Sequence, residues 1–313
     1  MEIENRCRAE FFSKDPVFGL EPPLLFAHRG GAREAPESTP KAFSLALNEA
    51  KTDVFELDAQ LSRDGEIVVW HGPELDNVLL ENAPVDAALR AAGRRNIDHF
   101  DWRELDGKAW VADHHTKDLS LVPCEPERRI LLFSELLDLY PGAPLNIELK
   151  PTFKNPLKAS PRCGMRDHVG RFLRILKESA GDRKVLVASA DTDILLEARR
   201  QSKERYPSNL TLKEQLRLLF LPPPESPPPR ALETTHHRLP AHPKLVAKAR
   251  RAGFPTFVFI TGYGPLFPPL DRDFPPPEDT VLEILDRGVH GLMTDRPQWL
   301  RPLLNKWKNR RKS

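Results

Sequence analysis

The chain has 313 residues, with 47 Lys or Arg, 45 Asp or Glu and a net charge of +2. A basic nucleic-acid surface or an acidic solvating tail needs a strong excess of one sign, so the near balance argues against both. Hydrophobic residues make up 40% of the chain, which suffices for a sizeable core and excludes global disorder. The 32 prolines must lie in loops and at element ends, because proline breaks helices and cannot occupy central strands.

The cysteines and the two ends of the chain predict the compartment. Cys7, Cys124 and Cys163 are odd in number and far apart, which disfavours a disulfide framework and fits a reducing compartment. The acidic N-terminus is followed by no apolar region typical of a signal peptide, and no apolar run approaches the roughly 18 residues of a membrane span. We therefore expect a soluble, cytoplasmic protein whose basic segment 306–313 is a solvated tail, with weak contact to an anionic membrane surface as the alternative.

The first elements in chain order are a strand, a helix and a hairpin. A strand over 24–28 runs into Gly30-Gly31, and Thr39 followed by Pro40 predicts the start of a helix that extends to Ala50. Strands over 54–58 and 67–71 flank Asp64-Gly65, a strong hairpin signal.

After residue 125 the chain alternates between strands and helices. The expected helices cover 134–140, 167–180, 192–201, 244–251 and 280–287, and the expected strands cover 145–149, 184–188, 209–212, 230–234, 256–260 and 290–294. Alternation of this kind predicts parallel strands, and about eight repeats over about 280 residues favour an α/β TIM (β/α)8 barrel over an open sheet. Residues 72–125 interrupt this alternation, with a helix expected over 85–92 and loop elsewhere.

Two proline-rich segments, 222–229 and 265–278, are read as stiff surface loops. The alternative is a polyproline helix that binds a partner. Directly before the first of these segments, Leu216–Leu221 is unusually apolar. This stretch is either a buried helix end or an apolar surface at the barrel rim.

Charged residues lie in two strands that should otherwise be apolar. Glu56 and Asp58 are two residues apart, which places both carboxylates on one face of a strand, and Asn146, Glu148 and Lys150 repeat the arrangement in the next barrel strand. In a barrel these faces converge at the carboxyl ends of the strands. Three converging carboxylates need a counter-charge, which predicts a hard divalent cation, Mg²⁺ or Ca²⁺ before Zn²⁺. Taken alone, the Glu56/Asp58 pair also fits a solvated edge strand.

Two histidines close strands at the same predicted mouth. His28 ends the first strand and His71 ends the hairpin. Each could be structural, but together they suggest a general acid and a general base. Arg29 and Lys150 add positive charge, and Gly30-Gly31 lets backbone N–H groups approach a ligand. The set predicts an oxyanion site, with phosphate as the oxyanion.

Eight segments of the chain, taken in order, resemble the motifs of the glycerophosphodiester phosphodiesterase family. They are Ala27–Gly31, Ala35–Thr39, Ala42-Phe43, Phe55–Asp58, Arg63–Gly65, Val68–His71, Asn146–Lys150 and Gly291–Pro297. The resemblance implies a TIM barrel over 23–305 with an inserted region after His71, preceded by an extension over 1–22. It also implies metal ligands Glu56, Asp58 and Glu148, the acid/base pair His28 and His71, phosphate-binding Arg29 and Lys150, and Glu37 in support.

The sequence departs from the family pattern on the side of the site that would hold the alcohol. Gly72 stands where the family usually has Asp, and Ser38 replaces Asn. Residues 188–190 and 259–262 replace the family's usual strand ends. We expect metal-dependent hydrolysis of a small phosphodiester to glycerol 3-phosphate and an alcohol. The alternatives are a lysophospholipase D acting on lysolipid and an inactive barrel that binds a partner through its proline-rich loops.

Overall fold

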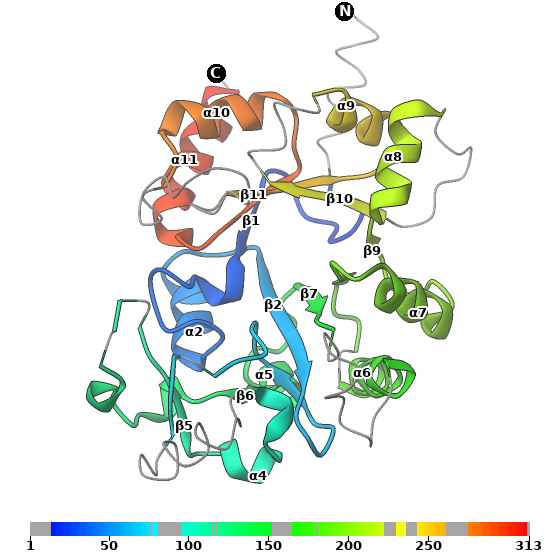
Figure 1. Cartoon of the computed structure of the whole chain (residues 1–313). Coiled ribbons are helices and arrows are strands. Elements are labelled where there is room, and N and C mark those ends of the chain that lie inside the picture. The colour runs from blue at the N-terminus through cyan, green and yellow to red at the C-terminus, as the bar shows by residue number, and fades with distance from the viewer. Residues whose placement is uncertain are drawn as a thin grey trace, which may run out of the picture.

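The computed structural model of the chain describes residues 14–75, 77–80, 96–113, 115–116, 118–151, 165–179, 181–221, 230–235, 243–260 and 275–311 (Figure 1). The helix expected over 85–92, the proline stretch 222–229 and most of the second proline-rich segment lie outside these residues. Among the described helices, none combines the length and apolar character that crossing a membrane requires.

A closed barrel of parallel strands forms the centre of the fold. In barrel order the strands are β1 (Leu24–Ala27), β2 (Val54–Leu61), β7 (Leu145–Leu149), β8 (Val185–Ala188), β9 (Ser208–Asn209), β10 (Arg230–Thr235), β11 (Thr256–Ile260) and β12 (Gly291–Thr294). Each strand pairs in parallel with the next, and β1 pairs with both β2 and β12, which closes the ring. The predicted TIM barrel is confirmed.

Helices surround the strands (Figure 1). They are α2 (Pro40–Asn48), α5 (Phe133–Leu139), α6 (Met165–Ser179), α7 (Thr192–Ser202), α8 (Leu212–Phe220), α9 (Pro243–Arg251), α10 (Glu278–Asp286) and α11 (Pro297–Arg310). The start of α2 is as the sequence predicts, because the Thr39 hydroxyl accepts the Ala42 N–H at 3.3 Å with Pro40 at the first position. The other predicted helices over described residues are confirmed with ends shifted by one or two residues.

The strand predicted over 209–212 is wrong at its end. It stops at Asn209, and Leu212 begins α8. A capping box explains the change: the Glu214 N–H donates to the Thr211 hydroxyl at 3.2 Å, and the Thr211 N–H donates to the Glu214 carboxylate at 2.7 Å. The sequence analysis expected a strand here and did not consider this cap.

The last helix was not predicted either. Helix α11 runs from Pro297 to Arg310, so most of the basic segment belongs to a helix, and Trp307 within it is buried against α10. The N-terminal segment is also anchored, because Phe18 packs against Phe26 and Phe257 with ring centroids 5.6 and 5.8 Å apart. The division into extension, barrel and tail remains a prediction.

The hairpin and insertion differ from expectation in detail. Strand β3 (Ile67–Val69) pairs antiparallel with the extended end of β2 and ends before His71, which lies in the following turn. Within the insertion, β4 (Val78–Leu80) pairs with β5 (Ala109–Val111), and the short helix α4 (Trp102–Leu105) packs in the same cluster. The hairpin thus carries the chain past the barrel mouth and returns His71 to it, since the Trp70 N–H donates to the Asp58 carbonyl.

An apolar layer fills the barrel below the mouth. Phe26 and Phe257 meet across it with centroids 4.7 Å apart, and Gly291 of β12 lies against Phe26. A Cβ at residue 291 would lie 2.7 Å from the Phe26 ring and 3.1 Å from the Leu24 carbonyl oxygen. Close packing of this layer therefore requires glycine at residue 291.

Replacing Gly291 with Ala should lower the free energy of unfolding by about 1–3 kcal/mol, because the added methyl would overlap the Phe26 ring and the Leu24 carbonyl oxygen. Chemical denaturation measures this change. Gly170→Ala on α6 is the matched control, since its Cβ would meet only the end of the flexible Gln201 side chain. Equal unfolding midpoints for Gly291→Ala and the unmodified protein would contradict the packing described here.

Candidate active site

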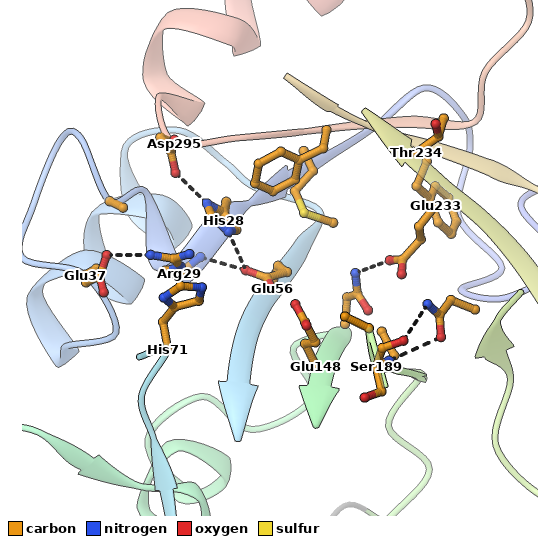
Figure 2. Close-up of a pocket in the computed structure, with 18 of the residues that line it drawn as sticks. His28, Arg29, Glu37, Glu56, His71, Glu148, Ser189, Glu233, Thr234 and Asp295 are labelled. Carbon is orange, nitrogen blue, oxygen red and sulfur yellow. Dashed lines mark hydrogen bonds and ion pairs between the residues drawn. The ribbon is translucent and has the colours of Figure 1, made fainter. Parts of the chain in front are cut away.

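A cavity of about 680 Å³ opens at the carboxyl ends of the barrel strands (Figure 2). Its lining combines two histidines, cationic and acidic side chains, a polar wall and six apolar side chains, three of them alanines. They are His28, Arg29, Ala32, Arg33, Glu37, Glu56, His71, Asn146, Glu148, Ala188, Ser189, Ala190, Asn209, Glu233, Thr234, Phe257, Phe259, Met293 and Asp295.

Three carboxylates gather on the inner faces of β2 and β7. Asp58 and Glu148 are register partners, and Glu56 lies two residues before Asp58 on the same face. One oxygen from each carboxylate lies within 4.8 Å of the others. Lys150 binds this cluster directly, with Nζ 2.9 Å from Asp58 and 2.8 Å from Glu148. The predicted convergence of the two charged strands is confirmed.

The cluster contains more negative charge than its neighbours neutralise. Burial and the adjacent Asp58 and Glu148 raise the pKa of Glu56 well above its usual range. Burial acts on Asp58 in the same direction, but Lys150 and Arg29 outweigh it and lower the pKa of Asp58. An all-oxygen donor set whose carboxylates repel one another fits a hard divalent cation, whose binding would favour the ionised form of Glu56.

Arg29 is fixed by a strained turn at the end of β1. It lies in the short helix η1 (His28–Gly30) with φ 51° and ψ 33°, a left-handed conformation that directs its N–H toward Glu56 Oε2 at 2.9 Å. Its Nη1 donates to Glu37 at 3.0 Å, and its Nε lies 3.4 Å from Asp58. Gly30 follows with φ 79°, and a Cβ there would lie 2.8 Å from the Ala42 Cβ. Glu37 therefore holds one end of the Arg29 guanidinium, and its supporting role in the reaction remains a prediction.

His28 is held between two carboxylates (Figure 2). Its Nδ1 lies 2.5 Å from Asp295 Oδ1 and its Nε2 lies 3.8 Å from Glu56 Oε2. Burial opposes ionisation of Asp295, but His28 lowers the pKa of that carboxyl. An ionised Asp295 accepts a hydrogen bond from the Nδ1–H of His28, which leaves Nε2 facing the cavity. The sequence analysis assigned Asp295 no role, although it lies in the quoted motif Gly291–Pro297.

His71 reaches the cavity from the turn after β3. The Gln60 amide donates to the carbonyls of His71 and Gly72 at 2.8 and 2.6 Å, which anchors this turn to β2. Burial, with further effects from Arg29 and Lys150, lowers the pKa of His71 to about 3, although Asp58 acts in the opposite direction. In this environment the imidazole is neutral at physiological pH.

The wall opposite Arg29 contains a residue that the sequence analysis missed. Glu233 on β10 reaches into the cavity and accepts a hydrogen bond from the Asn146 amide at 2.6 Å. Burial raises the pKa of Glu233 to about 7. A charged residue inside the predicted strand 230–234 was the available signal, the same one that identified Glu56 and Asp58.

All eight predicted site residues lie at this mouth. Six of them line the cavity, whereas Asp58 and Lys150 lie behind it in the ion pairs described above. The histidines His99, His115, His168 and His290 do not line it. The catalytic, phosphate-binding and metal-binding roles assigned from sequence remain predictions.

Comparison with known proteins gives consistent results. The profile of the glycerophosphoryl diester phosphodiesterase family matches residues 28–299. A human lysophospholipase D is 29% identical over 149 residues, which cover 47% of this chain and 40% of the relative. The chain thus matches less than half the length of the first curated relatives.

Solved structures show the same fold. An Oleispira antarctica phosphodiesterase in complex with its product, sn-glycerol-3-phosphate, superposes with a TM-score of 0.62 at 19% identity, covering 90% of this chain and 97% of the other. An Agrobacterium tumefaciens glycerophosphodiester phosphodiesterase has a TM-score of 0.60 at 19% identity, covering 89% of this chain and 99% of the other.

Adding Mg²⁺ or Ca²⁺ after treatment with EDTA should raise the melting temperature. A ligand bound only to the native state at 100 times its Kd stabilises that state by about 2.7 kcal/mol. Differential scanning calorimetry measures the shift, which Glu148→Gln should reduce and the surface variant Glu283→Gln should leave unchanged. An unmodified protein with the same melting temperature in EDTA and in saturating cation would show that the cluster binds neither ion.

Proposed function

Because the chain belongs to the glycerophosphoryl diester phosphodiesterase family, we propose that it hydrolyses a glycerophosphodiester to glycerol 3-phosphate and an alcohol with a bound Mg²⁺ or Ca²⁺. The observation that supports this most strongly is the grouping of His28, His71 and Arg29 with the carboxylate cluster in one cavity. Burying this many charged groups together costs stability. An inactive barrel would have no physical reason to keep them, which argues against that alternative.

The phosphate would bind between Arg29 and the carboxylate cluster. Glu37 and the left-handed turn hold the guanidinium in place, so its remaining donors face the cavity without reorganisation. Glu56, Asp58 and Glu148 would hold the cation, which would neutralise charge on the nonbridging oxygens. Lys150 already neutralises part of the charge of the cluster, and in this proposal its ammonium would also bind the phosphate.

The two histidines would move the protons. One imidazole accepts the proton of the attacking oxygen as its bond to phosphorus forms, and the other donates a proton to the alcohol oxygen as the old P–O bond breaks. The attacking oxygen belongs to water or to a neighbouring hydroxyl of the glycerol. Asp295 would fix the His28 ring so that only Nε2 exchanges protons with the substrate.

His28→Ala and His71→Ala should each lower turnover of a glycerophosphodiester by at least about 10²-fold, the lower limit for one proton-transfer group. An enzyme-coupled assay of glycerol 3-phosphate release in the presence of Mg²⁺ or Ca²⁺ measures this loss. His115→Ala, in the insertion and outside the cavity, is the matched control. Near-native turnover in either site variant, with the melting temperature retained, would show that the histidine is structural.

A lysolipid substrate is a second candidate, supported by the surface of α8. Leu212, Leu216 and Phe220 recur every four residues and are 67%, 47% and 79% exposed, and Leu221 is 49% exposed. Lys213 and Arg217 are exposed beside them. An exposed apolar stripe flanked by cations fits the surface of an anionic membrane, and the human relative is a lysophospholipase D.

Replacing Phe220 and Leu221 with Ser should lower turnover of vesicle-bound lysophospholipid and spare glycerophosphocholine. Burying each large apolar side chain contributes about 1.5–3 kcal/mol, and only the lipid surface gains it. Parallel assays on the two substrates measure the ratio, with Leu121→Ser as the control because Leu121 is 75% exposed outside α8. Equal losses on both substrates would favour the soluble diester.

A further inference from the structure

Two polar side chains meet across the barrel on the wall opposite Arg29. Asn146 comes from β7 and Glu233 from β10, and β8 and β9 lie between these strands in the barrel. The hydrogen bond of 2.6 Å from the Asn146 amide to Glu233 Oε1 therefore crosses the interior instead of joining neighbouring strands. This bond forms one side of the cavity (Figure 2).

The charge of the cavity lining is divided between two sides. Its described cationic and imidazole side chains, His28, Arg29, Arg33 and His71, come from the segment after β1 and the turn after β3. The described lining from β7 to β10 includes Glu233 and no positive side chain. Glu233 forms no ion pair with another described residue, so its carboxylate lacks a positive partner within that part of the protein.

A second acceptor lies beside Glu233. Asn146 is 2% exposed, and within the described residues its Oδ1 has no hydrogen-bond donor while its Nδ2 is used by Glu233. A buried acceptor without a donor costs about 1–3 kcal/mol unless a ligand or water supplies one. The wall thus contains a carboxyl group without a positive partner, next to a buried acceptor without a donor.

We propose that Glu233 and Asn146 form a subsite for an ammonium group carried by the alcohol of the phosphodiester substrate. The inference rests on the proposed function, since the phosphate held at Arg29 and the carboxylate cluster would direct the alcohol toward this wall. A primary ammonium donates N–H groups to both acceptors and neutralises the carboxylate. A neutral alcohol supplies no charge, and a quaternary ammonium supplies charge without N–H donors.

Two further observations agree with this assignment. Phe257 is the register partner of Glu233 on β11, and Phe259 lines the same cavity, so aromatic rings lie near the carboxylate as they do in many ammonium sites. Burial raises the pKa of Glu233 to about 7, so its carboxyl is only partly ionised near neutral pH, and a bound ammonium would favour the ionised form.

Binding of small phosphates tests the subsite without requiring turnover. Phosphoethanolamine and propyl phosphate differ only by an ammonium in place of a methyl group, and calorimetry in saturating Mg²⁺ or Ca²⁺ measures both affinities. We expect phosphoethanolamine to bind at least about tenfold more tightly, the gain typical of a charge-assisted hydrogen bond. Glu233→Gln, which keeps the shape and removes the charge, should abolish the preference, and Glu283→Gln should retain it. Equal affinities in the unmodified protein, or no binding of either phosphate, would overturn the inference.

Kinetics separate this inference from the proposed function. Glu233→Gln should lower kcat/KM for glycerophosphoethanolamine at least about tenfold relative to glycerophosphoglycerol, whose alcohol has no charge. Hydrolysis of both diesters with equal losses in the variant would overturn the ammonium subsite and leave the proposed function intact. Absence of hydrolysis would refute the proposed function, while the binding preference would still decide the subsite. Weaker affinity of the variant for the metal alone would make Glu233 a cation ligand and would also overturn the inference.

Discussion

Repulsion among three carboxylates buried at one end of the barrel is the constraint to which the rest of the site responds. Glu56 and Asp58 are almost fully buried, and Glu148 is their neighbour across the β2–β7 pair. The chain compensates part of this charge with Lys150 and Arg29, which lower the pKa of Asp58. Arg29 also lowers the pKa of Glu56, but by less than burial, Asp58 and Glu148 raise it. The remaining imbalance is what a divalent cation would remove.

The position of every group around this cluster follows from backbone geometry. Strand β2 continues past the mouth so that its antiparallel partner β3 can bring His71 back beside Asp58. On the other side, the left-handed residue Arg29 turns the chain after β1, which aims its N–H at Glu56, and His28 lies against Asp295, directly after the last strand. The first and last barrel strands are adjacent, so a contact between residues 28 and 295 requires ring closure.

Sequence predicted the parts of the site that depend on local patterns. The two-residue period of a strand was sufficient to place Glu56 with Asp58, and the strand ends indicated His28 and Arg29. Asp295 was missed because its partner is 267 residues away, and only the closed barrel brings the two together. The start of helix α8 was missed for a different reason: the sequence analysis expected a strand over 209–212, offered a helix end only as one interpretation of Leu216–Leu221, and did not consider the Thr211/Glu214 cap that begins the helix.

The two sides of the cavity differ in how readily they can be predicted, and the difference has a structural origin. The side around Arg29 is built from residues close together in sequence, 28–37 and 56–71, together with the single strand β7. The opposite wall takes one or two residues from each of β8, β9, β10 and β11, so no short motif describes it. The departures from the family pattern at residues 188–190 and at Phe259 lie on this wall. A barrel can therefore keep the residues around Arg29 while the wall changes residue by residue, and under our proposal Glu233, an acid on the inner face of β10, is the residue through which such a change would alter the alcohol that the site accepts.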